Sequence, residues 1–280
     1  MGSHIVDALK NTFDGGVFIG SHRATGVGMV PIDLTQFNKV DQYFDVVINA
    51  AGYGVVKTEM DLDRMMRVNY LGPASYLDRL TDETHWIQIG SAFEYELRDR
   101  ALTEATHCYP RTQYGISKWM FSHYLNATDR VLRSTIIRPF AMYGPREDGT
   151  KLIPYLIESQ LRRCEVPLSS GQQRRDYIYV KDAANWISRL VTRHLNGDRL
   201  PSVMNIGSGR ARSLRELATA LSGNIPNFES KLWKWGSISV RPNESDEFYN
   251  SSDLAAQFGF TESDAVTSFQ ETVDYYVKHS

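Results

Sequence analysis

Cysteine, net charge and long apolar runs are all scarce in this chain of 280 residues. Two cysteines, Cys108 and Cys164, are too few for a disulfide framework or a metal cluster, so a reducing cytoplasm is expected. No apolar run approaches the ~18 residues that cross a bilayer, and Asp7 and Lys10 interrupt the only candidate signal peptide. A formal net charge of −2 attracts neither nucleic acid nor an anionic membrane.

Apolar residues make up 42% of the chain, enough for a sizeable core in one large domain or two entwined ones. Hydrophobic periodicity predicts strands that alternate with helices. The predicted strands are 17–21, 29–32, 44–49, 85–89, 134–139, 177–180 and 204–206. The predicted helices are 1–10, 59–80, 113–128, 152–163, a segment capped by Asp182 and reaching 194, one capped by Ser213, and 267–278.

This alternation is typical of an α/β fold, a parallel sheet with helices on both faces. Ligands in such sheets bind beyond the carboxyl ends of the strands. Ala50, Ala51 and Gly52 follow the clearest strand, where small residues let a flat ligand approach the backbone or simply form a tight turn. Ser91 stands where the 85–89 strand ends, and its alternative reading is a surface loop serine.

Tyr114 and Lys118 are four residues apart on the predicted 113–128 helix, so both side chains lie on one face. A free tyrosine hydroxyl has a pKa near ~10, and a nearby ammonium lowers that pKa by stabilising the phenolate. The pair could therefore move a proton. The spacing alone is also common on ordinary helix surfaces.

Several short blocks occur together in one order and at matching intervals. On these blocks the chain resembles the extended short-chain dehydrogenase/reductase family of nucleotide-sugar epimerases, dehydratases and ketoreductases. The resemblance implies a Rossmann-like doubly wound parallel sheet with a smaller C-terminal α/β substrate-binding region. The blocks are Asp33-Leu34-Thr35, Asn49-Ala50-Ala51-Gly52, Ser91 with Tyr95, Tyr114 with Lys118, Arg138-Pro139, Tyr143-Gly144-Pro145, Arg175-Asp176-Tyr177, Asn205-Ile206-Gly207-Ser208-Gly209 and Arg241-Pro242.

By position, the resemblance makes Tyr114 the general acid/base and Ser91 a hydrogen-bond partner of the reacting carbonyl or alkoxide. Lys118 is expected to lower the Tyr114 pKa and to hold the nicotinamide ribose. Hydride transfer to a carbonyl builds an alkoxide, which needs a proton and donors already aimed at it.

The resemblance also assigns binding roles, and it implies no metal. Cofactor binding falls on Gly2, Arg23, Asp33, Leu34, Ala50, Ala51, Gly52, Asn69 and Lys118. Substrate binding falls on Ser91, Phe93, Tyr114, Arg175 and Arg241. The two arginines match residues that grip a nucleotide-sugar diphosphate, a task suited to guanidinium groups, and surface ion pairing is their alternative.

Within the family, the sequence most resembles the CDP-abequose synthase-like 4-ketoreductases, which act on nucleotide-activated 4-keto-6-deoxyhexoses. Arg23 follows the second family strand, where an arginine suits the 2′-phosphate of NADP(H), although NAD(H) stays open. Ala92-Phe93 stands where the dehydratases have an Asp-Glu pair, which argues against elimination chemistry. Ala141 replaces a common substrate-contacting asparagine. The resemblance makes a homodimer plausible.

One part of the pattern is absent. Residues 1–4 align with the end of the glycine-rich fingerprint, so the first family strand and its turn, roughly ten residues, do not appear in the chain. A late start codon, a tag remnant, or a real loss of ordinary dinucleotide binding would each explain this. We expect a dinucleotide-binding domain at 1–142, completed by about 177–209, and a nucleotide-sugar region at 143–176 and 210–280.

Three functions follow from the sequence. The leading hypothesis is NADPH-dependent reduction of the C4 ketone of a nucleotide-activated deoxysugar. A nucleotide-sugar C4 epimerase with tightly held NAD is the second. The third, suggested by the missing fingerprint, is a non-catalytic nucleotide-sugar-binding protein.

Overall fold

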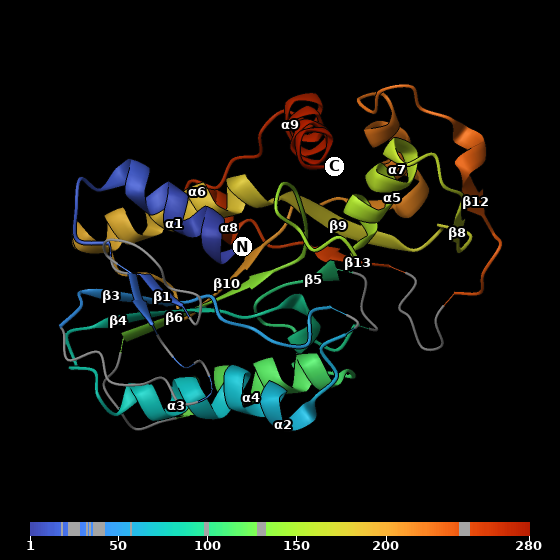
Figure 1. The fold of residues 1–280 in the computed structure, drawn as a ribbon. Coiled ribbons are helices and arrows are strands. Elements are labelled where there is room, and N and C mark those ends of the chain that lie inside the picture. Colours follow the sequence, from blue (N-terminus) through green and yellow to red (C-terminus); the bar gives the residue numbers. More distant parts are fainter. Residues whose placement is uncertain are drawn as a thin grey trace.

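A four-stranded parallel sheet forms the centre of the computed structural model (Figure 1). The structure describes residues 1–17, 19–21, 29–31, 33, 35, 43–56, 58–97, 101–127, 133–240 and 247–280. The strands of the central sheet follow the order β10-β6-β4-β3, which confirms the predicted parallel α/β architecture. Their bounds are β3 (Val46–Asn49), β4 (His85–Ile89), β6 (Arg133–Pro139) and β10 (Val203–Ile206).

Helices cover both faces of this sheet (Figure 1). On one face lie α1 (Gly2–Thr12) and α6 (Val180–Leu195), which pack on Ile87 and Ile89 of β4. The other face carries α3 and α4, which pack on Trp86. All five residues of β4 are buried, since alternate side chains serve opposite helical layers. The elements of this second layer are α2 (Leu62–Met66), the π-helix η1 (Arg67–Leu71), α3 (Gly72–Leu77) and α4 (Gln113–Ala127).

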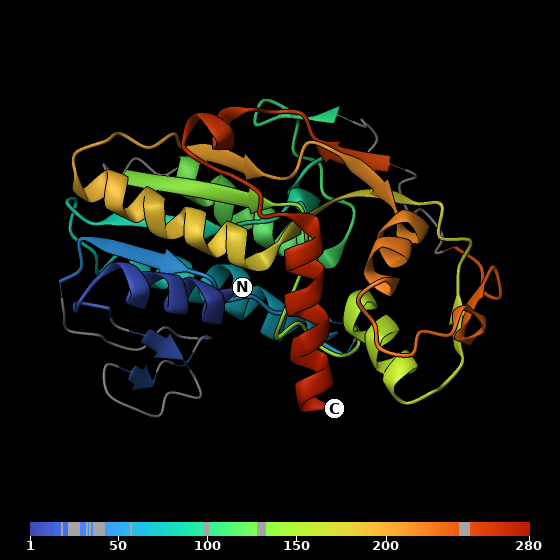
Figure 2. The same cartoon turned by 90° about the horizontal axis from the view of Figure 1, so that it is seen from above.

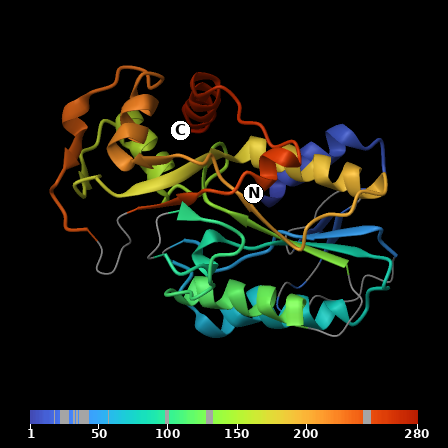
Figure 3. The same cartoon turned by 180° about the vertical axis from the view of Figure 1, so that it is seen from behind.

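A second apolar cluster belongs to the C-terminal half (Figure 3). It joins α5 (Leu152–Leu161), α7 (Leu214–Ser222) and α9 (Ala265–His279) with the parallel pair β8 (Val166–Leu168) and β12 (Trp233–Trp235). Between the two clusters, β9 pairs with β7, β11 and β13, and β13 pairs with β5. These strands are β5 (Ala101–Leu102), β7 (Ala141–Tyr143), β9 (Arg174–Tyr179), β11 (Ala211–Ser213) and β13 (Glu247–Asn250).

Two N-terminal strands lie outside the central sheet. β1 (Ile19–Ser21) and β2 (Met29–Pro31) form a separate parallel pair beyond β3 (Figure 2). Among the described residues, β3 pairs along one edge only, with β4. Val46, Val47 and Ile48 are therefore only half-buried, although their composition is typical of a strand covered on all sides.

Most predicted elements are confirmed, and two predictions are wrong in detail. The single helix expected at 59–80 is three consecutive pieces with a π-helix in the middle. Asp182 does not cap α6, because Tyr179 is the N-cap residue and Asp182 lies in the first turn. Its carboxylate instead accepts a hydrogen bond from the Ser263 N–H at 2.8 Å. Ser213 does cap α7, where its hydroxyl accepts from the Glu216 N–H at 3.1 Å. No helix in the described parts of the chain could cross a membrane.

One buried histidine should make stability depend on pH. His85 is 3% exposed, and burial together with His194 and Arg133 lowers its pKa to about 4 from 6.5. Below pH 6.5 the unfolded chain takes up a proton that folded His85 refuses until about pH 4, so stability falls as the pH falls through this window. Between about pH 7.5 and about pH 5 we expect His85 to cost about 2 kcal/mol of unfolding free energy.

Urea denaturation of wild type and His85→Gln at the two pH values measures this loss. The variant should lose about 2 kcal/mol less than wild type on acidification. His279→Gln, at an exposed position, is the matched control and should behave like wild type. Equal losses in wild type and His85→Gln would contradict the assignment.

Candidate active site

The three predicted catalytic side chains meet at the carboxyl end of β4. Ser91 follows this strand and is 6% exposed, while Tyr114 and Lys118 lie in the first half of α4. Tyr114 is partly buried, and its phenol lies near enough to the Ser91 side chain for that side chain to lower its pKa. Lys118 is 3% exposed. The residues are therefore placed as a proton-transfer group requires.

The electrostatics of Tyr114 differ from the sequence-based prediction. Burial raises the pKa of the phenol, and the negative charges of Glu94 and Glu59 raise it further, whereas the Ser91 hydrogen bond lowers it. The Tyr114 pKa is thus raised rather than lowered, and the effect expected of Lys118 stays a prediction. Burial lowers the pKa of Lys118 itself to about 8, although Glu94 opposes the shift. At neutral pH the phenol is protonated, which suits a proton donor.

Two glycines allow this close packing. A Cβ on Gly115, next to Tyr114, would lie 2.3 Å from the Phe93 carbonyl oxygen. A Cβ on Gly90, just before Ser91, would lie 2.3 Å from Glu94 Oε1. The start of α4 and the turn after β4 therefore approach each other as only glycine permits.

Predicted cofactor residues from three elements also converge. A Cβ on Gly2 would lie 3.6 Å from the Ala50 Cβ, so the start of α1 touches the chain leaving β3. Lys118 Nζ donates to the Ala51 carbonyl oxygen at 3.4 Å. Gly52 is exposed, and no atom lies within 4 Å of the position its Cβ would take. This edge is thus lined by small residues and ends at the lysine.

Asn69 holds the same edge in place from the π-helix. It is 1% exposed, accepts from the Tyr53 N–H at 2.9 Å and donates to the Tyr53 carbonyl at 2.8 Å. Its amide also donates to the Ser117 hydroxyl at 2.8 Å. The predicted cofactor residue therefore ties the loop after β3 to α4, and would act on a cofactor through that loop.

These residues fit one half of a dinucleotide. The N-terminus of α1 has no side-chain cap and no acid in its first turn, so its free N–H groups suit a diphosphate. Asp33 is exposed, and its carboxylate accepts from the Thr35 N–H at 2.8 Å and the Thr35 hydroxyl at 2.6 Å. Arg23 and Leu34 lie outside the described residues. The described residues thus fit the diphosphate and nicotinamide ribose best.

Aromatic rings connect Tyr114 with the predicted substrate arginine. Phe93 lies edge-on to Tyr114 at 6.5 Å and to Phe248 at 6.1 Å between ring centroids. The Arg175 guanidinium stands 4.6 Å from the Phe248 centroid, and it donates to the Arg174 carbonyl at 2.7 Å. The structure thus brings Phe93 and Arg175 to one wall, while Arg241 lies outside the described residues.

Two residues of this site escaped the sequence analysis. Phe248 has no local signal, because β13 reaches β9 only through long-range pairing. Glu94 has one, since Ser91-Ala92-Phe93-Glu94 is a Ser-x-x-Glu capping box at the 3₁₀ turn η2 (Ala92–Glu94). The pattern predicts a turn, but not that its glutamate is fully buried beneath the site.

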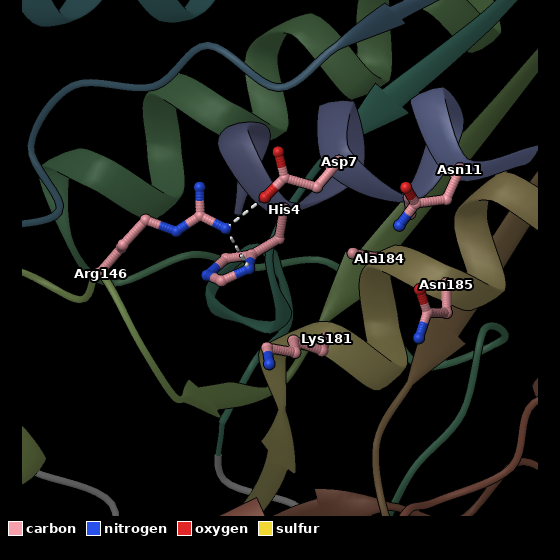
Figure 4. Close-up of a pocket in the computed structure, with 8 residues that line it drawn as sticks. His4, Asp7, Asn11, Arg146, Lys181, Ala184 and Asn185 are labelled. Atoms are coloured by element: carbon pink, nitrogen blue, oxygen red, sulfur yellow. Dashed lines mark hydrogen bonds and ion pairs between the residues drawn. The ribbon is translucent and has the colours of Figure 1, made fainter. Parts of the chain in front are cut away.

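A cavity of about 370 Å³ lies elsewhere, between α1 and α6 (Figure 4). Arg146 points toward α1, where it contacts His4 Nδ1 at 3.0 Å and forms an ion pair with Asp7. Lys181 pairs with Glu271 at 2.6 Å. Both cations are already neutralised, so this cavity is no match for the predicted chemistry. Its lining is His4, Asp7, Ala8, Asn11, Arg146, Lys181, Ala184 and Asn185.

Fold and site together define a Rossmann-like α/β protein of the dinucleotide-dependent oxidoreductase class. The sequence model of the NAD dependent epimerase/dehydratase family matches residues 1–207. The chain belongs to that family, as its resemblance to the extended short-chain dehydrogenases implies.

Solved structures share the fold. The NAD-dependent NDP-hexosamine 5,6-dehydratase TunA, of tunicamycin biosynthesis, is 22% identical with a TM-score of 0.83, covering 100% of this chain and 95% of that chain. UDP-glucose 4-epimerase of Thermotoga maritima, with UDP-glucose, is 20% identical with a TM-score of 0.81 and coverages of 99% and 96%. UDP-N-acetylglucosamine 4-epimerase of Methanobrevibacter ruminantium, with UDP-N-acetylmuramic acid, is 20% identical with a TM-score of 0.82 and coverages of 100% and 95%.

Gly115 offers a test of the close packing at this site. In Gly115→Ala the new methyl group meets the backbone of Phe93, which cannot move aside as a side chain would. We expect a loss of about 1–3 kcal/mol in unfolding free energy, measured by denaturant titration. Gly223→Ala is the control, because its Cβ would lie 3.9 Å from its nearest neighbour, the Ala220 carbonyl oxygen. Equal stability of Gly115→Ala and wild type would contradict the close approach.

Proposed function

We propose that this protein reduces the C4 ketone of a nucleotide-activated 4-keto-6-deoxyhexose with NADPH. The observation that carries the proposal is the placement of the Tyr114 phenol beside Ser91 at the carboxyl end of β4, with Lys118 one turn further along the same helix. A ketoreductase needs a protonated donor at the forming alkoxide.

The protein's residues have separate tasks in this reaction. NADPH, when bound, supplies the hydride for the C4 carbonyl. Ser91 and Tyr114 donate hydrogen bonds to the carbonyl oxygen, and Tyr114 gives up its proton as the negative charge develops. Lys118 and the Ala50-Ala51-Gly52 edge would hold the nicotinamide ribose. The N-terminus of α1 would take the diphosphate.

The wall beside Tyr114 supports a deoxysugar substrate. Phe93 is 41% exposed and packs edge-on against the buried Phe248, so it offers an apolar surface that suits a C6 methyl group better than a hydroxymethyl or carboxylate group. Arg175, held against Phe248, is suited to the diphosphate of the nucleotide. Phe93 and Ala92 carry no acid or base for an elimination. A homodimer is part of the proposal on the family resemblance alone.

Two other functions have an observation in their favour. Several solved structures with this fold are 4-epimerases, including a Thermus thermophilus UDP-glucose 4-epimerase bound to NAD, which favours epimerisation with a retained cofactor. The separation of the β1–β2 pair from β3 favours a binding protein that no longer holds a dinucleotide in the usual way.

One set of assays separates the three functions. The purified protein is mixed with NADPH and a CDP- or dTDP-4-keto-6-deoxyhexose, and absorbance at the NADPH band is followed. Net NADPH consumption supports the ketoreductase. Sugar interconversion without net consumption, together with copurified NAD, supports the epimerase. Calorimetric binding of the nucleotide sugar without binding of either dinucleotide supports the binding protein.

Tyr114→Phe tests the proton donor directly. Only a hydroxyl is removed, so the fold should persist by circular dichroism, while the reduction rate should fall by roughly 10²–10⁴-fold. Tyr155→Phe, at a side chain 42% exposed on α5, is the control and should keep the wild-type rate. A near-normal rate in Tyr114→Phe would show that another group protonates the alkoxide.

A further inference from the structure

We propose that Glu94 is a positioning residue of this active site: its buried carboxylate fixes Ser91 and presents a negative charge to Tyr114 and Lys118. The inference deepens the proposed function and rests on it for its catalytic meaning. The arrangement of charges can nevertheless be tested without turnover.

Both carboxylate oxygens of Glu94 are committed. Its side chain is 0% exposed, and Oε1 accepts a hydrogen bond from the Ser91 N–H at 2.9 Å. Oε2 accepts from Arg138 Nε at 2.9 Å, in an ion pair in which both side chains are buried. Ser91 in turn accepts from the Phe93 N–H at 3.2 Å, which closes the capping box. The hydrogen-bond partner of Tyr114 is thus oriented by Glu94.

The orientation of Glu94 is itself set by two further strands. Arg138 belongs to β6, and its guanidinium lies 4.6 Å from the Tyr95 ring centroid. The Tyr95 hydroxyl donates to Asn205 Oδ1 on β10 at 2.7 Å. Glu94 therefore connects Ser91 with β6 and β10 through side chains that are all buried.

The negative charge of Glu94 influences the protonation of Tyr114 and Lys118. The negative charges of Glu94 and Glu59 act on Tyr114 together with the Ser91 side chain, and the charge of Glu94 acts on Lys118 of the same helix. Glu94 raises the pKa of both Tyr114 and Lys118, and so favours the neutral phenol and the charged ammonium. Three groups act on the Arg138 guanidinium: the Glu94 carboxylate, the Tyr95 phenol and the thiol of Cys108, which lies in the loop before α4.

Glu94→Gln removes the charge but keeps an acceptor for the Ser91 N–H. In the proposed reduction, the pH limb of kcat/KM that reports Tyr114 should move to lower pH by about one unit. Glu96→Gln is the matched control, since this neighbouring glutamate pairs at 3.2 Å with Arg111, which is half exposed. An unchanged limb in Glu94→Gln would overturn the proposal.

Lysine NMR provides a readout that needs neither substrate nor cofactor. With ¹³C-labelled lysine, the Cε resonance absent from Lys118→Met identifies Lys118, and its titration gives the pKa. Wild type should titrate at about pH 8, Glu94→Gln about one unit lower, and Glu96→Gln as wild type. Equal values in wild type and Glu94→Gln overturn the proposal. Absence of turnover alongside the expected shift overturns the proposed reaction only.

A second variant covers the case in which Glu94→Gln does not fold. The single change leaves Arg138 buried without its carboxylate partner, which is strongly destabilising and could unfold the chain. In Glu94→Gln/Arg138→Gln two amides replace the ion pair. The charge that reaches Lys118 and Tyr114 is that of Glu94, so the double variant should show the same downward shift. A folded double variant with the wild-type Lys118 pKa contradicts the inference.

Discussion

A buried ion pair joins the strand ends on which the site is built. Glu94 follows β4, Arg138 lies on β6, and Tyr95 carries the connection to Asn205 on β10. Taking two charges out of water is expensive, and the attraction repays the cost only when the remaining donors and acceptors are satisfied. Here Ser91 supplies one of those partners through its backbone. The energy that holds the sheet ends together therefore also orients a reacting side chain.

This pair also marks where sequence reasoning stops. Local patterns predict β4, α4 and the Ser213 cap, because hydrophobic period and capping chemistry act over a few residues. The partner of Glu94 is 44 residues away, and that of Asp182 is 81 residues away. Pairings between residues this far apart in the chain leave no local pattern. Neither the burial of Glu94 nor the direction of the Tyr114 pKa shift could therefore be predicted from the sequence. The π-helix around Asn69 was hidden for the same reason, since it depends on contacts with Tyr53 and Ser117.

The predicted catalytic residues and the described edge of β3 that lacks a partner belong to different parts of the fold. Ser91, Glu94 and Tyr114 depend on β4, β6 and α4, which are packed on both sides. The described edge of β3 that lacks a partner faces the β1–β2 pair, the region that holds Asp33. Val46, Val47 and Ile48 are only half-buried, because no described strand pairs with that edge of β3.

The charge beneath Tyr114 decides which protonation states of the phenol and of the Lys118 ammonium are favoured. A tyrosine that begins by removing a proton needs a cation nearby to stabilise the phenolate, whereas a tyrosine that delivers a proton needs the neutral phenol to persist. Glu94 favours the neutral phenol and at the same time favours the charged form of Lys118, whose pKa burial has lowered to about 8. Tyr114 and Lys118, which the sequence singles out by their spacing of four residues, are therefore better described as a group of three with the buried carboxylate of Glu94. The third member favours a phenol that keeps its proton and an ammonium that keeps its charge.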